Sequence, residues 1–102
     1  MDLNRELADI GALIASAQVI ALVRQEVKSA LNGDRAMVIG SQFAPNVKNA
    51  SDYDLVVVHR NGKEASEVIS RRIKAMMPDA KIVAFDNIVD NVIGIKQSRR
   101  TR

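Results

Sequence analysis

The first third of the chain repeats apolar residues at the spacing of an amphipathic helix. From Asp2 to about Leu31 these residues recur every three or four positions, which predicts a helical segment. Two apolar stripes can be distinguished along it. The first is a seam formed by Leu3, Leu7, Ile10, Ile14, Ala17 and Ala21, and the second, displaced around the helix, is formed by Ile20, Val23, Val27, Ala30 and Leu31.

The two stripes predict different surroundings for the two halves of this segment. We expect the helical segment to cover a sheet, and the seam in its first half either to join this core or to face a second subunit or partner. The seam spans fewer than three heptads, which is too short to define a coiled coil. Gly11 and Ser16 favour a break or bend, and Gly33 is a natural residue to end the helix.

The rest of the chain carries short β-prone runs, turn residues and one more helical pattern. Apolar positions from Val68 to Met77 share one helix face, and Pro78 ends that helix. Residues 42–51 are polar, contain Pro45, and are typical of an exposed loop. Strands are expected over 35–39, 53–59 and 81–85, while 88–95 is compatible with a fourth strand or a short helix.

The order of these elements predicts the fold class. Helix, strand, strand, helix and strand in this order favour an α/β (α+β) fold, with a small mixed β-sheet covered by helices. At 102 residues the chain is long enough for one modest core. We therefore expect a single domain over residues 1–95, with the helical segment (about 2–31) at its start and a basic tail over 96–102.

Composition restricts the chemistry available to this domain. The chain has no cysteine and one histidine, His59, which excludes a thiolate zinc site and a histidine-rich metal site. We interpret His59 as a strand-end residue rather than a catalyst. The absence of cysteine favours a reducing, cytoplasmic location.

The net charge of +3 arises from one end of the chain. The basic tail from Lys96 to Arg102 has four positive charges and no negative ones, and the remaining residues have a balance of −1. Such a tail can bind nucleic acid or an acidic partner. The longest uncharged apolar stretch, Ile10 to Val23, has 14 residues. This is too short to cross a bilayer, so no membrane contact is expected.

Residues that suit phosphate and metal chemistry gather in one stretch. An apolar run ends at Gly40-Ser41, ten residues follow, and Asp52-Tyr53-Asp54 opens the next strand. Side chains alternate along a strand, so Asp52 and Asp54 are expected on one face. Carboxylate oxygens are suitable Mg²⁺ ligands, the Ser41 hydroxyl can donate to a phosphate, and Gly40 lets the backbone approach one.

This stretch resembles the signature of minimal nucleotidyltransferases of the DNA polymerase β-like nucleotidyltransferase superfamily. The resemblance covers about residues 18 to 90 and depends on Gly40, Ser41, Asp52 and Asp54. It implies a nucleotidyltransferase-like fold and a Mg²⁺-dependent transfer of a nucleoside monophosphate from a nucleoside triphosphate such as ATP to a hydroxyl. Small members of the family act with a separate helical partner, and some are antitoxins that modify a partner toxin. The apolar seam suits such a partner or a homo-oligomer.

The resemblance also implies roles for individual residues. Gly40, Ser41 and the adjacent Gln42 would hold the nucleotide, while Asp52 and Asp54 would be catalytic ligands of two Mg²⁺ ions. A third carboxylate on a later strand completes the family's site. Asp86 is our choice for it, because it follows the strand at 81–85, and Asp79 and Asp90 are alternatives.

Two residues of the spacer depart from the family's pattern. Members commonly have Arg after Gly-Ser and a second Gly in the spacer, where this chain has Gln42 and Pro45. Gln42 does not neutralise phosphate charge as Arg does. Pro45 stiffens the loop and removes a backbone donor. These departures favour the alternative hypothesis, a catalytically degenerate nucleotidyltransferase-fold protein that acts as a protein- or nucleic-acid-binding module.

Overall fold

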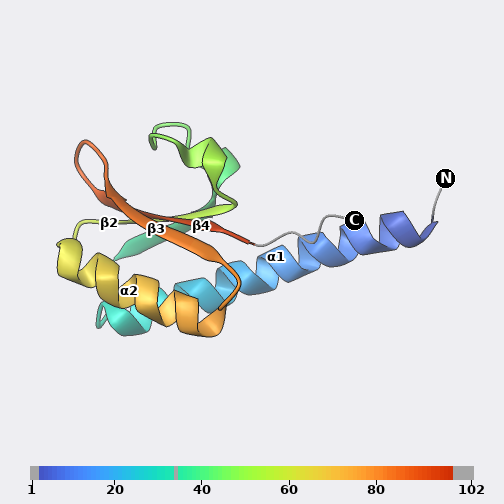
Figure 1. Ribbon diagram of the computed structural model, residues 1–102, viewed down its shortest axis with the longest axis horizontal. Coiled ribbons are helices and arrows are strands. Elements are labelled where there is room, and N and C mark those ends of the chain that lie inside the picture. Colours follow the sequence, from blue (N-terminus) through green and yellow to red (C-terminus); the bar gives the residue numbers. More distant parts are fainter. Residues whose placement is uncertain (1–2, 34, 98–102) are drawn as a thin grey trace.

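The computed structural model describes residues 3–33 and 35–97, and the side chains of residues 3–16 are outside the description. The main elements are two helices and four strands, joined by two short 3₁₀ turns (Figure 1). In chain order they are α1 (Leu3–Ala30), β1 (Ala36–Gly40), η1 (Ser41–Phe43), η2 (Ala50–Asp52), β2 (Leu55–His59), α2 (Lys63–Met76), β3 (Lys81–Asp86) and β4 (Asn91–Lys96).

The four strands form one sheet in the order β1-β2-β4-β3. All three neighbouring pairs are antiparallel. The expected α+β class is confirmed, but the described sheet is antiparallel rather than mixed. The reason is that β4 returns from β3 as a hairpin and lies between β3 and β2, so that β2 and β3 do not pair with each other. The undecided segment 88–95 thus contributes the fourth strand.

Both helices cover the same face of the sheet (Figure 1). The predicted second stripe of α1 packs here, with Val23, Val27 and Leu31 buried. Ile69 and Ile73 of α2 are fully buried against the same core. Alternate residues of β2, Leu55 and Val57, complete it from the sheet. The periodicity of the two helical patterns thus identified these core-facing positions, but it was wrong for Val68, which is exposed on α2.

The opposite face of the sheet is partly covered by the segment between β1 and β2. This segment lies above the sheet in Figure 1 and includes both 3₁₀ turns. Ala44 and Ala50 are buried against Val56 and Val92 in a second, smaller apolar cluster. The segment 42–51 was predicted as an exposed loop, and this prediction was wrong for these two alanines because their small side chains allow close packing on the strands.

Tyr53 packs the end of this segment against the sheet. Its ring lies over Gly94 of β4 and stacks on Phe85 of β3, with ring centroids 5.9 Å apart and an interplanar angle of 20°. A Cβ atom at position 94 would lie 2.6 Å from the Tyr53 ring, closer than van der Waals contact permits. Gly94 is therefore required for the close approach of Tyr53 rather than for an unusual backbone conformation.

The first half of α1 extends beyond the sheet (Figure 1). The helix is continuous through Gly11 and Ser16, so the break that these residues favoured is absent. Ala17 and Ala21, which end the predicted seam, are exposed. The rest of the seam, Leu3 to Ile14, lies among side chains outside the description. Neither helix of the described chain is both long and apolar enough to span a membrane.

Candidate functional site

The Gly-Ser turn and the Asp-x-Asp segment meet at one end of the sheet. Gly40 is the last residue of β1 and is in register with Leu55, the first residue of β2. Immediately beyond this pair, the Ser41 N–H donates a hydrogen bond to the Asp54 carbonyl oxygen at 3.1 Å. The antiparallel pairing therefore brings the Gly-Ser turn next to Asp54, although the connection between β1 and β2 separates them in sequence.

Asp52 and Asp54 precede β2 instead of lying on it. Asp52 ends η2, and β2 begins at Leu55, so the expected strand start at residue 53 was two residues early. Tyr53 nevertheless has extended dihedral angles, φ −125° and ψ 160°. Asp52, however, belongs to the 3₁₀ turn, where the alternation of side chains along a strand does not apply. The shared face expected for the two carboxylates is therefore not fixed by a strand; Asp52 is exposed and Asp54 is half-buried.

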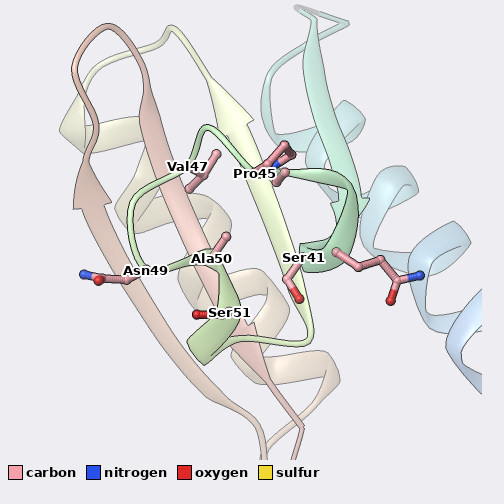
Figure 2. A pocket seen from close by; sticks show the side chains of 8 residues that line it. Ser41, Pro45, Val47, Asn49, Ala50 and Ser51 are labelled. Atoms are coloured by element: carbon pink, nitrogen blue, oxygen red, sulfur yellow. The ribbon is translucent and has the colours of Figure 1, made fainter.

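A hollow of about 390 Å³ opens inside the loop that joins β1 to β2. Ser41 and Gln42, both predicted as nucleotide-binding residues, line it together with Asn49 and Ser51 (Figure 2). Its volume is within the range of small-molecule sites. Pro45, Val47 and the alanines supply apolar walls. Asn49 and Ser51 were not predicted from the sequence, because loop polarity alone does not reveal which residues line a hollow.

The backbone conformation at position 40 does not require glycine. Its φ of −62° and ψ of 143° are accessible to any residue. A Cβ atom there would lie 3.6 Å from the Phe43 ring, an ordinary van der Waals distance. The fold therefore tolerates a side chain at position 40, and whether glycine matters there depends on a ligand.

The structure does not bring Asp86 to this site. Asp86 is in register with Asn91, which is in register with His59 at the far end of β2. Five residues separate Asp54 from His59, which is roughly 16 Å along a strand. Asp86 instead forms an exposed ion pair with Lys63, with 3.4 Å between Oδ2 and Nζ. Asp86 is thus wrong as the third carboxylate, because the prediction used strand order and the register depends on long-range pairing.

The two alternatives do not complete the site either. Asp90 is at the same far end as Asp86 and pairs with Arg60 at 3.2 Å. Asp79 precedes β3 at the near end of the sheet, where Lys81 is in register with Lys96. Among the residues that the structure describes, no three acidic or histidine side chains form a group able to hold a metal. The described residues therefore do not supply the three carboxylates of the expected two-ion site.

Asp54 has a second contact that sequence reasoning missed. Its carboxylate Oδ2 accepts a hydrogen bond of 2.8 Å from the Gln97 N–H, and its own N–H donates to the Ile95 carbonyl at 2.9 Å. Asp54 thus extends the β2–β4 ladder and fixes the chain just after β4. No local sequence signal identifies this contact, since it joins residues 43 positions apart.

His59 is the last residue of β2, as expected, and its side chain is buried. It is 2% exposed on the helix-covered face, and its Nε2 lies 2.7 Å from the Ser66 hydroxyl oxygen of α2. Burial lowers the pKa of His59 from its ordinary value of 6.5, and the negative charge of Asp90 opposes this shift. His59 is therefore neutral near pH 7 and lies at the opposite end of β2 from Asp54.

Comparisons with known proteins give no match, whether against protein-family models, curated proteins or solved structures. The nucleotidyltransferase resemblance therefore rests on Gly40, Ser41, Asp52 and Asp54. Of these, the structure joins Ser41 to Asp54 directly through the backbone, and Asp52 lies two residues before Asp54 at the end of η2.

Proposed function

We propose that this chain binds a Mg²⁺–nucleoside triphosphate at the Gly40-Ser41 turn and transfers its nucleoside monophosphate to a hydroxyl. The observation that carries the proposal is the Ser41–Asp54 hydrogen bond, because it brings the Gly40-Ser41 turn next to Asp54, and Ser41 also lines the open hollow. A nucleoside triphosphate substrate would suit the cytoplasmic location that we propose for this activity.

The donor set suits a magnesium ion that the substrate itself helps to hold. Mg²⁺ is usually bound by one or two carboxylates together with phosphate oxygens and water. Asp52 and Asp54 supply two hard oxygen ligands, and the triphosphate would supply the others. Bound there, the ion would neutralise phosphate charge during transfer.

The protein's own contribution to this reaction is positioning. Phosphoryl-group transfer needs alignment and charge neutralisation more than covalent chemistry from the protein. In this proposal the Ser41 hydroxyl would donate to a phosphate oxygen, and the hollow would hold part of the nucleotide. The acceptor oxygen bonds to the α-phosphorus, the bond to the bridging oxygen breaks, pyrophosphate leaves, and the acceptor proton passes to solvent.

A partner protein is the acceptor that best suits the extended first half of α1. The exposed Ala17 and Ala21 end the apolar seam, and the first half of α1 extends past the sheet (Figure 1). We propose that this segment binds a helical partner, as in an antitoxin that modifies its toxin, or a second copy of the chain. Changing Leu3 and Leu7 to Glu is expected to abolish capture of the labelled acceptor without unfolding the domain.

The transfer assay uses α-³²P-labelled ATP, CTP, GTP or UTP with Mg²⁺ and lysate. We expect a labelled acceptor with the wild type and at least tenfold less label with Asp52→Asn/Asp54→Asn. Asn at position 54 keeps an oxygen that can accept from the Gln97 N–H, so the fold is preserved. Asp86→Asn is the matched control and is expected to label normally. Equal labelling by all three proteins would refute the proposed site.

A second candidate function is a catalytically silent binding module. It is favoured by the position of Asp86 at the other end of the sheet and by the structural use of the Asp54 carboxylate. It predicts that Asp52→Asn/Asp54→Asn still captures the partner, while Leu3→Glu/Leu7→Glu no longer does. A wild-type protein that captures the partner but transfers no nucleotide would favour the binding module.

A further inference from the structure

We infer that a second hollow, between the end of α1 and the outer edge of β1, binds a phosphate monoester. This α1–β1 hollow has a volume of about 370 Å³, which is within the range of small-molecule sites. Arg24, Lys28 and Arg35 line it, and none of the described residues that line it is acidic. The inference goes beyond the proposed function and does not depend on it.

The way in which α1 ends brings these three basic residues to one place. Arg24 and Lys28 are four residues apart, so they share a face of the helix. The helix ends at Ala30, and the Gly33 N–H donates to the Lys28 carbonyl at 3.1 Å. Gly33 has a φ of +90°, a conformation that favours glycine and reverses the chain direction after a helix. The chain thus turns back, and Arg35 enters the wall of the same hollow just before β1.

The Arg24 side chain is held in place without a ligand. Its Nε and Nη2 donate to the Val38 carbonyl oxygen of β1 at 3.3 and 3.1 Å. A guanidinium group has five N–H donors, so the remaining ones can donate to an oxyanion in the hollow. Because the side chain is already ordered, a ligand that binds it loses less affinity to conformational entropy.

The positive charge of the hollow is not balanced by ion pairs. Among the described residues, the ion pairs are formed by other basic residues, Arg60, Lys63 and Arg72. Arg24 and Lys28 therefore repel each other across one turn of the helix, and an anion between them would relieve this repulsion. The end of α1 adds only about half a negative charge, which is less than the charge of the three basic residues.

The charge and shape of the donor groups favour a phosphate monoester. Such a group carries roughly 1.5 to 2 negative charges near pH 7, and guanidinium groups bind its oxygens in a bidentate manner. Arg24 and Arg35 supply two guanidinium groups, and Lys28 supplies a third cation. Binding to a nucleic-acid backbone needs a longer basic surface, whereas the other basic residues named above are paired with carboxylates. We therefore expect recognition of one phosphate group on a small molecule.

The test titrates phenyl phosphate into the isotope-labelled full chain and follows the backbone amide signals by NMR, with a chelator present to remove Mg²⁺. We expect saturable shifts that centre on Gly33, Arg35 and Ala36, which line the hollow. Benzoate has the same ring with a singly charged carboxylate and is the matched control ligand. It is expected to bind about tenfold more weakly than phenyl phosphate.

Two variants test the contribution of the charges. Lys28→Gln/Arg35→Gln is expected to bind phenyl phosphate about tenfold more weakly, because two charge-assisted contacts are lost. Arg24 is retained because it also bonds to β1. The control, Arg71→Gln/Lys81→Gln, removes two exposed charges that do not line the hollow. Its affinity is expected to change by less than about threefold.

Four results would overturn the inference: no binding of phenyl phosphate, equal affinities in the two variants, shifts that centre on Ser41 instead of Gly33, or benzoate binding as tightly as phenyl phosphate. Tighter binding of a short oligouridylate without terminal phosphates at the same amides would also overturn it, because the hollow would then recognise a nucleic-acid backbone. None of these results bears on the proposed function, since neither Asp52 nor Asp54 lines the α1–β1 hollow.

Discussion

At Gly94 the sheet leaves no room for a side chain, because the Tyr53 ring lies directly over it. Gly94→Ala must displace that ring from Phe85 and with it the segment that carries Asp52 and Asp54. We expect this variant to lose about 1–3 kcal/mol of unfolding free energy, the range for overpacking. Urea denaturation followed by circular dichroism measures the loss.

Gly62→Ala is the matched control for this prediction. No atom lies within 4 Å of a Cβ built there, and its φ of −69° suits any residue. It precedes α2, so its replacement is expected to cost less than about 1 kcal/mol. If Gly94→Ala is no more destabilising than Gly62→Ala, the packing of Tyr53 on β4 is incorrect.

His59 gives the domain a pH dependence whose sign follows from its burial. Its folded-state pKa is below the unfolded value of 6.5, so acid protonates the unfolded chain first. Stability is fully present above pH 6.5 and is lost as the pH falls below it, toward the folded pKa. Denaturation at pH 5 and pH 7.5 is expected to show this loss, and His59→Gln should reduce it. If His59→Gln shows the same difference in unfolding free energy between pH 5 and pH 7.5 as the wild type, the pH dependence does not come from His59.

At the scale of elements, Arg24 of α1 covers the free edge of β1. Its Nε and Nη2 donate to the Val38 carbonyl at 3.3 and 3.1 Å. An uncovered edge strand is a site for pairing with another chain. The helix thus protects the strand that leads into the Gly40-Ser41 turn.

Replacing Arg24 by Met tests this protection. We expect a loss of about 1–2 kcal/mol in unfolding free energy from the missing hydrogen bonds, and increased self-association at high concentration. Size-exclusion chromatography with light scattering measures the second effect. Arg71→Met, on the exposed side of α2, should change neither quantity. Identical behaviour of the two variants would exclude an edge-covering role for Arg24.

The helices and strands were predictable from the sequence, whereas the pairing of the strands was not. Helices and strands follow local periodicity, so the core positions Val23, Val27, Ile69 and Ile73 were found from spacing alone. The position of β4 between β2 and β3 depends on pairing between distant segments. That register decides which strand ends meet, and Asp86 was misplaced for this reason. The Gly40-Ser41 and Asp54 contact was predictable because a single antiparallel pair creates it.

At the scale of the whole molecule, one face of the sheet carries the larger core and the other carries the candidate site. The helix-covered face holds the larger apolar core, including the buried His59 and Ser66 pair. The loop-bearing face carries the hollow, and both lie in one elongated body of 48 × 25 × 21 Å (Figure 1). Because the larger core lies on the other face and Asn at position 54 keeps an oxygen that can accept from the Gln97 N–H, Asp52→Asn/Asp54→Asn is expected to leave the fold intact.

Magnesium-dependent nucleotide binding tests the central claim most directly. Titration of each nucleoside triphosphate into the wild type, Asp52→Asn/Asp54→Asn and Asp86→Asn, with Mg²⁺ and with chelator, compares the two ends of the sheet in one experiment. We predict binding by the wild type and by Asp86→Asn that requires Mg²⁺, and at least a tenfold loss in the double variant. Absence of binding by the wild type, or the same affinity in the double variant, would contradict a nucleotide site at Gly40-Ser41.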